Sequence, residues 1–177
     1  SGGKNLALSI GTGNLSLNGT NRLSATAGNL DLAVTRGNLT LAQSNTVTAG
    51  TDLGVVIQTG SLTATGLTTL QAGRNASLTV STGNISLSDT STVAAGNNLS
   101  TTIGTGDFSS SGQTVLSATG GNLGLNLTQG NVSLLGNNTL SAGQNLALSI
   151  GTGNLTLSGT TRLRATAGKL ELAVTRG

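Results

Sequence analysis

The chain has 177 residues, of which 35% are hydrophobic and 7% are charged, and its formal net charge is +3. It contains 28 Gly, one aromatic residue (Phe108) and no Cys, Pro, Met, Trp, Tyr or His. These values exclude a disulfide framework, an aromatic-rich globular core and the high charge typical of disordered chains. The eight scattered basic residues, without aromatic side chains for base stacking, argue against nucleic-acid binding. Low complexity with preserved apolar content favours a repetitive fold.

The first part of the chain predicts three short strands separated by turns. Residues 6–10 alternate between apolar and small or polar side chains, and a period of two is typical of a strand with one buried face. Gly13-Asn14 then predicts a turn, because Gly accepts a positive φ and Asn bonds to its own backbone. Two further alternating segments, 15–17 and 23–25, predict the second and third strands.

The same unit recurs along the whole chain. Its first buried residue returns at spacings of 24, 23, 23, 23, 24, 23 and 24, at Leu6, Leu30, Leu53, Ala76, Leu99, Leu123, Leu146 and Leu170. The extra residue of each 24-residue unit falls in the last corner, where a loop tolerates a change of length and a strand does not. Residues 1–177 are predicted to form a single β-helix segment, with coils that start near residues 3, 28, 50, 73, 96, 120, 143 and 168.

Two folds can use such units: an antiparallel meander, or a coil that stacks on itself in parallel. The coil is favoured because identical residue types recur at each level, which lets Leu stack on Leu and Asn on Asn. The two-residue hairpin turns of a meander also lack a regular pattern. The sequence therefore predicts an all-β fold, a parallel β-helix (solenoid) with three short strands in each coil. About seven coils give a rod roughly 35 Å long.

A longer internal repeat spans six coils. Residues 143–177 repeat residues 3–37 at an offset of 140, and the stretch 5–15 returns unchanged as 145–155. This indicates duplication of a six-coil block. We expect the segment to be a fragment of a longer repeat array, because a free solenoid needs polar caps.

The Gly-Asn-Leu-x-Leu runs, as in 27–32 and 142–148, resemble the repeat region of filamentous haemagglutinin-type exoproteins. Those are the large secreted partners of bacterial two-partner secretion systems, and the resemblance covers the whole chain. It implies a right-handed parallel β-helix, export through an outer-membrane two-partner secretion transporter, and display at the bacterial cell surface. Members of the family include adhesins and contact-dependent growth-inhibition proteins. The resemblance thus implies a virulence-related cell-adhesion or toxin-delivery protein, with this segment as the shaft that extends its distal region.

Two columns of polar side chains are candidate structural sites. The turn after the first strand, here the first corner, is expected to carry a ladder of Asn14, Asn38, Ser61, Asn84, Asp107, Asn131 and Asn154. The second strand carries an outward column of Ser16, Thr40, Thr63, Ser86, Ser109, Ser133 and Thr156. We expect hydroxyl ladders on a solvated face rather than an ice-binding surface, because the flanking positions vary.

No catalytic, cofactor-binding or metal site is predicted, and the chain is expected not to be an enzyme. The acids, Asp31, Asp52, Asp89, Asp107 and Glu171, are scattered, and no His or Cys can serve as base, nucleophile or ligand. Asp31 and Glu171 occupy one outward position six coils apart, roughly 29 Å along the rod. Gly120-Gly121 is followed by Asn-Leu, which departs from the Gly-Gly-x-Gly-x-Asp pattern of calcium-binding repeats.

Surface recognition is the alternative to a passive shaft. Arg162, Arg164, Lys169 and Arg176 are candidates for a weak patch for anionic ligands, and the repeated polar faces for weak multivalent binding of host glycans or cells. Ten Asn-x-Ser/Thr sequons leave glycosylation as a minority hypothesis. The sequence contains no run of 18 apolar residues, so no membrane span is predicted. The fragment is a candidate for end-to-end stacking.

Overall fold

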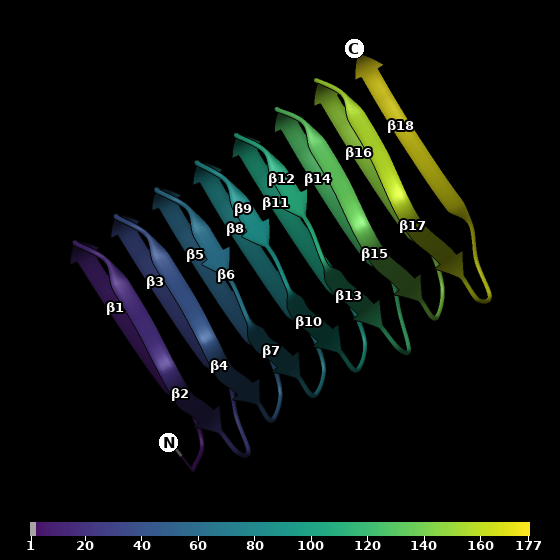
Figure 1. The fold of residues 1–177 in the computed structure, drawn as a ribbon. Helices are drawn as coiled ribbons and strands as arrows, with labels where there is room; N and C mark the ends of the chain where they lie inside the picture. Colours follow the sequence, from purple (N-terminus) through teal and green to yellow (C-terminus); the bar gives the residue numbers. More distant parts are fainter. Residues whose placement is uncertain (1–2) are drawn as a thin grey trace.

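The computed structural model describes residues 3–177 as a parallel β-solenoid of about seven turns, without helices in that range. The coils stack along one axis from β1 and β2 at one end to β17 and β18 at the other (Figure 1). Every strand pairing is parallel and joins a residue to its counterpart 23 or 24 positions later, as in Leu6 with Leu30 and Leu30 with Leu53. The parallel β-helix prediction is confirmed.

The first strands of the coils form an eight-stranded sheet. Its order is β1 (Leu6–Thr12), β3 (Leu30–Arg36), β5 (Leu53–Thr59), β8 (Ala76–Thr82), β11 (Leu99–Thr105), β14 (Leu123–Gln129), β16 (Leu146–Thr152) and β18 (Leu170–Arg176). The first, third and fifth residues of the inner strands are buried and the second and fourth point outward. The predicted alternation is therefore present in this sheet.

The remaining strands form a ten-stranded sheet. Its members are β2 (Leu15–Ala25), β4 (Leu39–Ala49), β6 (Leu62–Ala64), β7 (Leu67–Ala72), β9 (Ile85–Leu87), β10 (Thr90–Ala95), β12 (Phe108–Ser110), β13 (Gln113–Ala118), β15 (Val132–Ala142) and β17 (Leu155–Ala165). The three middle coils have separate second and third strands, as predicted. In β2, β4, β15 and β17 the two merge into one 11-residue strand.

The second corner lies between the second and third strands, and the chain bends there in merged and separate coils alike. One residue in each coil takes a positive φ there: Gly19, Gln43, Gly66, Asp89, Gly112, Gly136 and Gly159. A single left-handed residue bends the chain, and the two strands merge where the pairing continues through the bend, between β2 and β4 and between β15 and β17.

A column of inward polar side chains closes the same corner. Asn45 donates its amide to the Ala42 carbonyl at 2.6 Å, and the Ser91 hydroxyl donates to the Ser88 carbonyl at 2.8 Å. Asn45, Thr68, Ser91, Thr114 and Asn138 are all about 1% exposed. Four of these side chains donate to carbonyls inside the bend and hold the corner from within, whereas the buried Thr114 hydroxyl has no hydrogen-bond partner.

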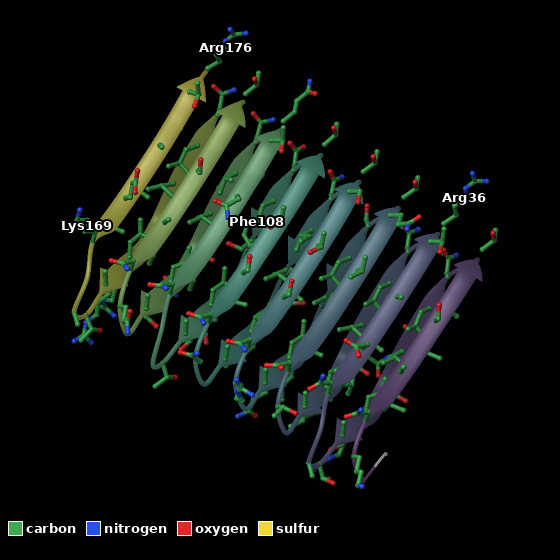
Figure 2. The ribbon with its side chains drawn as sticks, turned by 180° about the vertical axis from the view of Figure 1, so that it is seen from behind. Arg36, Phe108, Lys169 and Arg176 are labelled. Carbon is green, nitrogen blue, oxygen red and sulfur yellow. The ribbon has the colours of Figure 1, made fainter. Side chains whose placement is uncertain are left out.

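The core consists of stacked aliphatic columns with one aromatic layer. Phe108 is fully buried and stacks between Ile85 and Val132 (Figure 2). Two positions later on the same strand, Ser110 occupies a column filled by Leu in the coils on either side. A larger side chain is thus offset by a smaller one in the same coil, as dense packing requires.

Candidate functional site

The first corner carries a continuous hydrogen-bonded ladder, which joins all seven residues expected there. Except at the last residue, Asn154, each side-chain oxygen accepts from the backbone N–H of its counterpart in the next coil. Asp107 accepts from the backbone N–H of Asn131 at 2.7 Å, and Asn131 accepts from that of Asn154 at 3.0 Å. Because every oxygen faces the next coil, the ladder has one direction along the rod.

The glycine before each ladder residue makes this stacking possible. Gly106 has a φ of +140°, and a Cβ placed on it would lie within 3.0 Å of the Gly83 carbonyl oxygen in the preceding coil. Any other residue would meet both backbone strain and a steric clash. The Gly-Asn pair therefore turns the chain and presents the amide to the neighbouring coil.

A second ladder at the third corner was not predicted. It comprises Asn5, Asn29, Asp52, Asn75, Asn98, Asn122, Asn145 and the backbone of Lys169. Asn75 donates both its backbone N–H and its side-chain amide to Asp52, at 3.0 and 2.9 Å. The signal was present in the sequence, because an Asn or Asp directly precedes the first buried residue in seven units.

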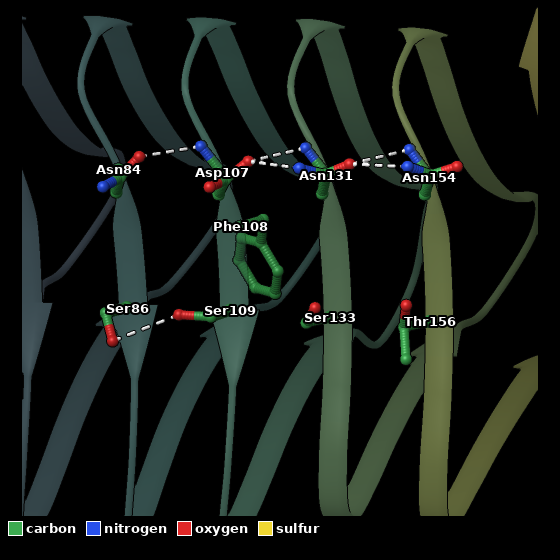
Figure 3. Close-up of a pocket in the computed structure, with 9 residues that line it drawn as sticks. All are labelled: Asn84, Ser86, Asp107, Phe108, Ser109, Asn131, Ser133, Asn154 and Thr156. Atoms are coloured by element: carbon green, nitrogen blue, oxygen red, sulfur yellow. Dashed lines mark hydrogen bonds between the residues drawn. The ribbon is translucent and has the colours of Figure 1, made fainter. Parts of the chain in front are cut away.

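A shallow polar groove of about 520 Å³ lies along the second strands beside the first-corner ladder. One side is the row of amide and carboxylate side chains of Asn84, Asp107, Asn131 and Asn154, and the other is the hydroxyl row of Ser86, Ser109, Ser133 and Thr156 (Figure 3). Phe108, whose side chain is fully buried, lies between the two rows. The groove runs across four coils and offers hydrogen-bonding groups repeated about every 4.8 Å.

The hydroxyl column of the second strands stacks in register, as the pairing of Ser86, Ser109 and Ser133 shows. One bond joins two hydroxyls of this column, from Ser109 to Ser86 at 3.2 Å. Ser16 instead donates to the side chain of Asn18 in its own strand. The column is thus an array of hydroxyl groups, only part of which are occupied by neighbouring side chains.

The acidic side chains lie on separate coils. Asp31 and Glu171 project from β3, the second strand of the eight-stranded sheet, and from β18, its last strand. Asp52 and Asp107 belong to the two corner ladders, and the Asp89 carboxylate accepts from the Gly66 backbone N–H at 2.9 Å. Within residues 3–177, no group of three His, Cys, Asp or Glu side chains is placed to hold a metal ion.

The four candidate basic residues do not all share one spot. Arg162 and Arg164 point outward from β17, whereas Lys169 precedes β18 and Arg176 ends it. Lys169 and Arg176 therefore lie at opposite ends of β18, roughly 23 Å apart along the strand (Figure 2). Arg162, Arg164 and Lys169 remain as neighbours along the chain, on either side of the third corner.

The sequons fall into two structural groups. Seven belong to the corner ladders: Asn14, Asn38, Asn75, Asn84, Asn98, Asn131 and Asn154. Asn18, Asn126 and Asn137 lie outside the ladders and are exposed. Most sequons therefore follow from the structural need for a corner Asn, whereas these three do not.

Residues 3–177 contain no helix with the length and apolar content needed to cross a bilayer. Comparison of the chain with protein-family models, with curated proteins and with solved structures finds no match. The resemblance to filamentous haemagglutinin-type exoproteins therefore rests on the repeat pattern, with which the β-solenoid is compatible.

Proposed function

We propose that this chain is the structural shaft of a secreted, surface-displayed bacterial exoprotein, an adhesin or a contact-dependent growth-inhibition protein. Its role is to hold a distal binding or toxin region away from the cell. The observation that carries this proposal is the unbroken stacking of like residues in both sheets and both corner ladders. Such a rod resists bending because each coil bonds to its neighbours through backbone and side chains together.

Two further features support a spacer. The six-coil block is repeated, and duplication of whole blocks lengthens a rod without altering its cross-section. The acidic side chains lie on separate coils, so the described surface presents no cluster of the kind used in acid–base chemistry. The repeat pattern supports export by a two-partner secretion transporter and display at the cell surface.

Duplication of residues 15–154 tests the spacer role, because Asn14-Leu15 and Asn154-Leu155 join without a mismatch. In a surface-displayed parent, the insertion is expected to move the distal end outward by roughly 29 Å, measured by electron microscopy, with unchanged binding of the distal region. Collapse of the added coils, or loss of distal binding although the coils fold, would contradict the proposal.

The polar groove beside the first corner favours a second candidate, weak multivalent binding of glycans by the shaft itself. Its amide and hydroxyl rows match the hydrogen-bonding groups of sugars, although it lacks the exposed aromatic ring on which sugars stack. A glycan array probed with the isolated chain separates the candidates. A flat profile supports the spacer, and a specific signal that persists at high salt supports the binder.

A further inference from the structure

The charged side chains on the two broad outer surfaces are segregated by sign. We define the acidic face as the outward positions of the eight-stranded sheet, where Asp31 and Glu171 are the charged residues within 3–177. The basic face comprises the outward positions of the third strands, where Arg22, Arg162 and Arg164 are the charged residues. All five are exposed. The other eight charged residues lie at or beside the corners, with Arg36 and Arg176 as the last residues of β3 and β18.

The opposite charges share one spacing along the rod. Asp31 and Glu171 are 140 residues apart, and so are Arg22 and Arg162. Both intervals are six coils, or roughly 29 Å. Each acid also follows its arginine by nine residues, which is less than half of a 23- or 24-residue coil, from Arg22 to Asp31 and from Arg162 to Glu171. A shift of less than one coil therefore aligns both opposite-charge pairs of two parallel rods at once.

The coils between these charges present short, uncharged side chains on both faces. The acidic face carries Gly, Ser, Thr, Asn and Val at its outward positions from β5 to β14, and Val56 there is 43% exposed. The basic face carries mainly Thr and Ser between its arginines. Because these intervening coils carry no charge on either face, closing the two surfaces against each other buries no unpaired charge there.

We propose that two copies of this chain associate side by side, the acidic face of one against the basic face of the other. Asp31 and Glu171 then meet Arg22 and Arg162. A contact about 35 Å long and 20 Å wide covers roughly 700 Å² on each partner, close to the usual ~800 Å². Exposed ion pairs are weak and screened by salt, so the association is weak and salt-sensitive. The dimer keeps one free face of each kind, so association continues beyond the dimer.

The unmodified chain is examined first, by sedimentation velocity and small-angle scattering at low and high salt. Side-by-side association predicts a sedimentation coefficient and a cross-sectional radius that rise with protein concentration at about 20 mM salt and fall back at about 500 mM, as charge screening requires. Growth in length at constant cross-section would show end-to-end stacking instead. That result, or a monomer at every concentration, overturns the proposal.

Charge reversal then tests the two faces separately. Asp31→Arg with Glu171→Arg is expected to abolish the association, as is Arg22→Glu with Arg162→Glu. An equimolar mixture of these two variants is expected to restore it, because each supplies the charge that the other lacks. All of these side chains are exposed, and circular dichroism verifies that the variants fold.

Arg36→Glu with Arg176→Glu is the matched control. It lies at the first corner, has the same 140-residue spacing, and lowers the net charge from +3 to −1, as Arg22→Glu with Arg162→Glu does. The control is expected to associate like the unmodified chain. If it fails to associate, or if the mixed variants stay monomeric, the assignment of the two faces is overturned.

Discussion

Replacement of Gly106 by Ala is expected to destabilise the solenoid strongly. The new Cβ would lie within 3.0 Å of the Gly83 carbonyl oxygen, and the backbone would keep a φ of +140°. The φ alone costs ~1–3 kcal/mol, and the clash forces the corner away from the coil before it. The loss in free energy of unfolding should therefore reach at least ~3 kcal/mol, within the range that marks a specific structural defect.

Gly124→Ala is the control for this change. Gly124 lies in β14 without a positive φ, and a Cβ there would meet only the Asn126 amide nitrogen, at 3.3 Å. That substitution should be neutral or stabilise by up to ~1 kcal/mol, because Ala has fewer unfolded conformations to lose. Urea unfolding followed by circular dichroism measures both, and Gly106→Ala should lower the midpoint by roughly 1 M or more. Equal midpoints for the two variants would refute the close stacking of corners.

Three smaller changes probe other parts of the coil, each measured by urea unfolding. Asn131→Ala removes an acceptor and a donor from the first-corner ladder and should lower the free energy of unfolding by ~1–2 kcal/mol. Asn137→Ala, outside the ladders, should lower it by less than ~0.5 kcal/mol. Equal losses in the two variants would contradict a contribution of the ladder to stability. Thr101→Val removes a buried hydroxyl that has no hydrogen-bond partner and should raise the free energy of unfolding by ~1 kcal/mol, with Thr102→Val at an outward position as the control. A lower free energy of unfolding would show that the Thr101 hydroxyl has a hydrogen-bond partner. Gln43→Gly relieves the backbone strain of a φ of +73° and should raise the free energy of unfolding by ~0.5–1 kcal/mol. A lower free energy of unfolding would show that contacts of the Gln43 side chain stabilise the fold by more than the strain costs.

The sequence predicted those features that repeat with a simple period. Alternation in residues such as Leu30 and Leu32 identified the first strands, and the recurring Gly-Asn pair identified the first-corner ladder. The choice of a coil over a meander followed from like residues recurring at every level, and the parallel register confirms it.

The second corner could not be predicted in the same way. Asn45 and Ser91 look like ordinary outward polar residues, yet they point inward, because a left-handed residue two positions earlier reverses the alternation. Gln43 and Asp89 stand where other coils have Gly, which hides the column from a search for glycine. Whether the second and third strands merge depends on the pairing of single peptide groups at the bend, and residue type does not encode this.

The four basic residues proposed as a patch, Arg162, Arg164, Lys169 and Arg176, do not all lie together, for a geometric reason. Sequence proximity places Lys169 and Arg176 seven residues apart, but an extended strand carries them to opposite corners of the coil. By contrast, Asp31 and Glu171 lie far apart in sequence and share one face, because their offset is a whole number of coils.

The central claim is that counterparts lie above one another on one axis at a fixed rise. The chain has no Cys, so pairs of introduced cysteines can carry spin labels without background. Labels at Ala7 and Ser100, at Ala7 and Ala147, and at Ala7 and Glu171 span four, six and seven coils. Pulsed electron spin resonance should give mean distances near 19, 29 and 34 Å, rising in proportion to the number of coils. Distances that fail to rise with the number of coils would contradict the stacked solenoid.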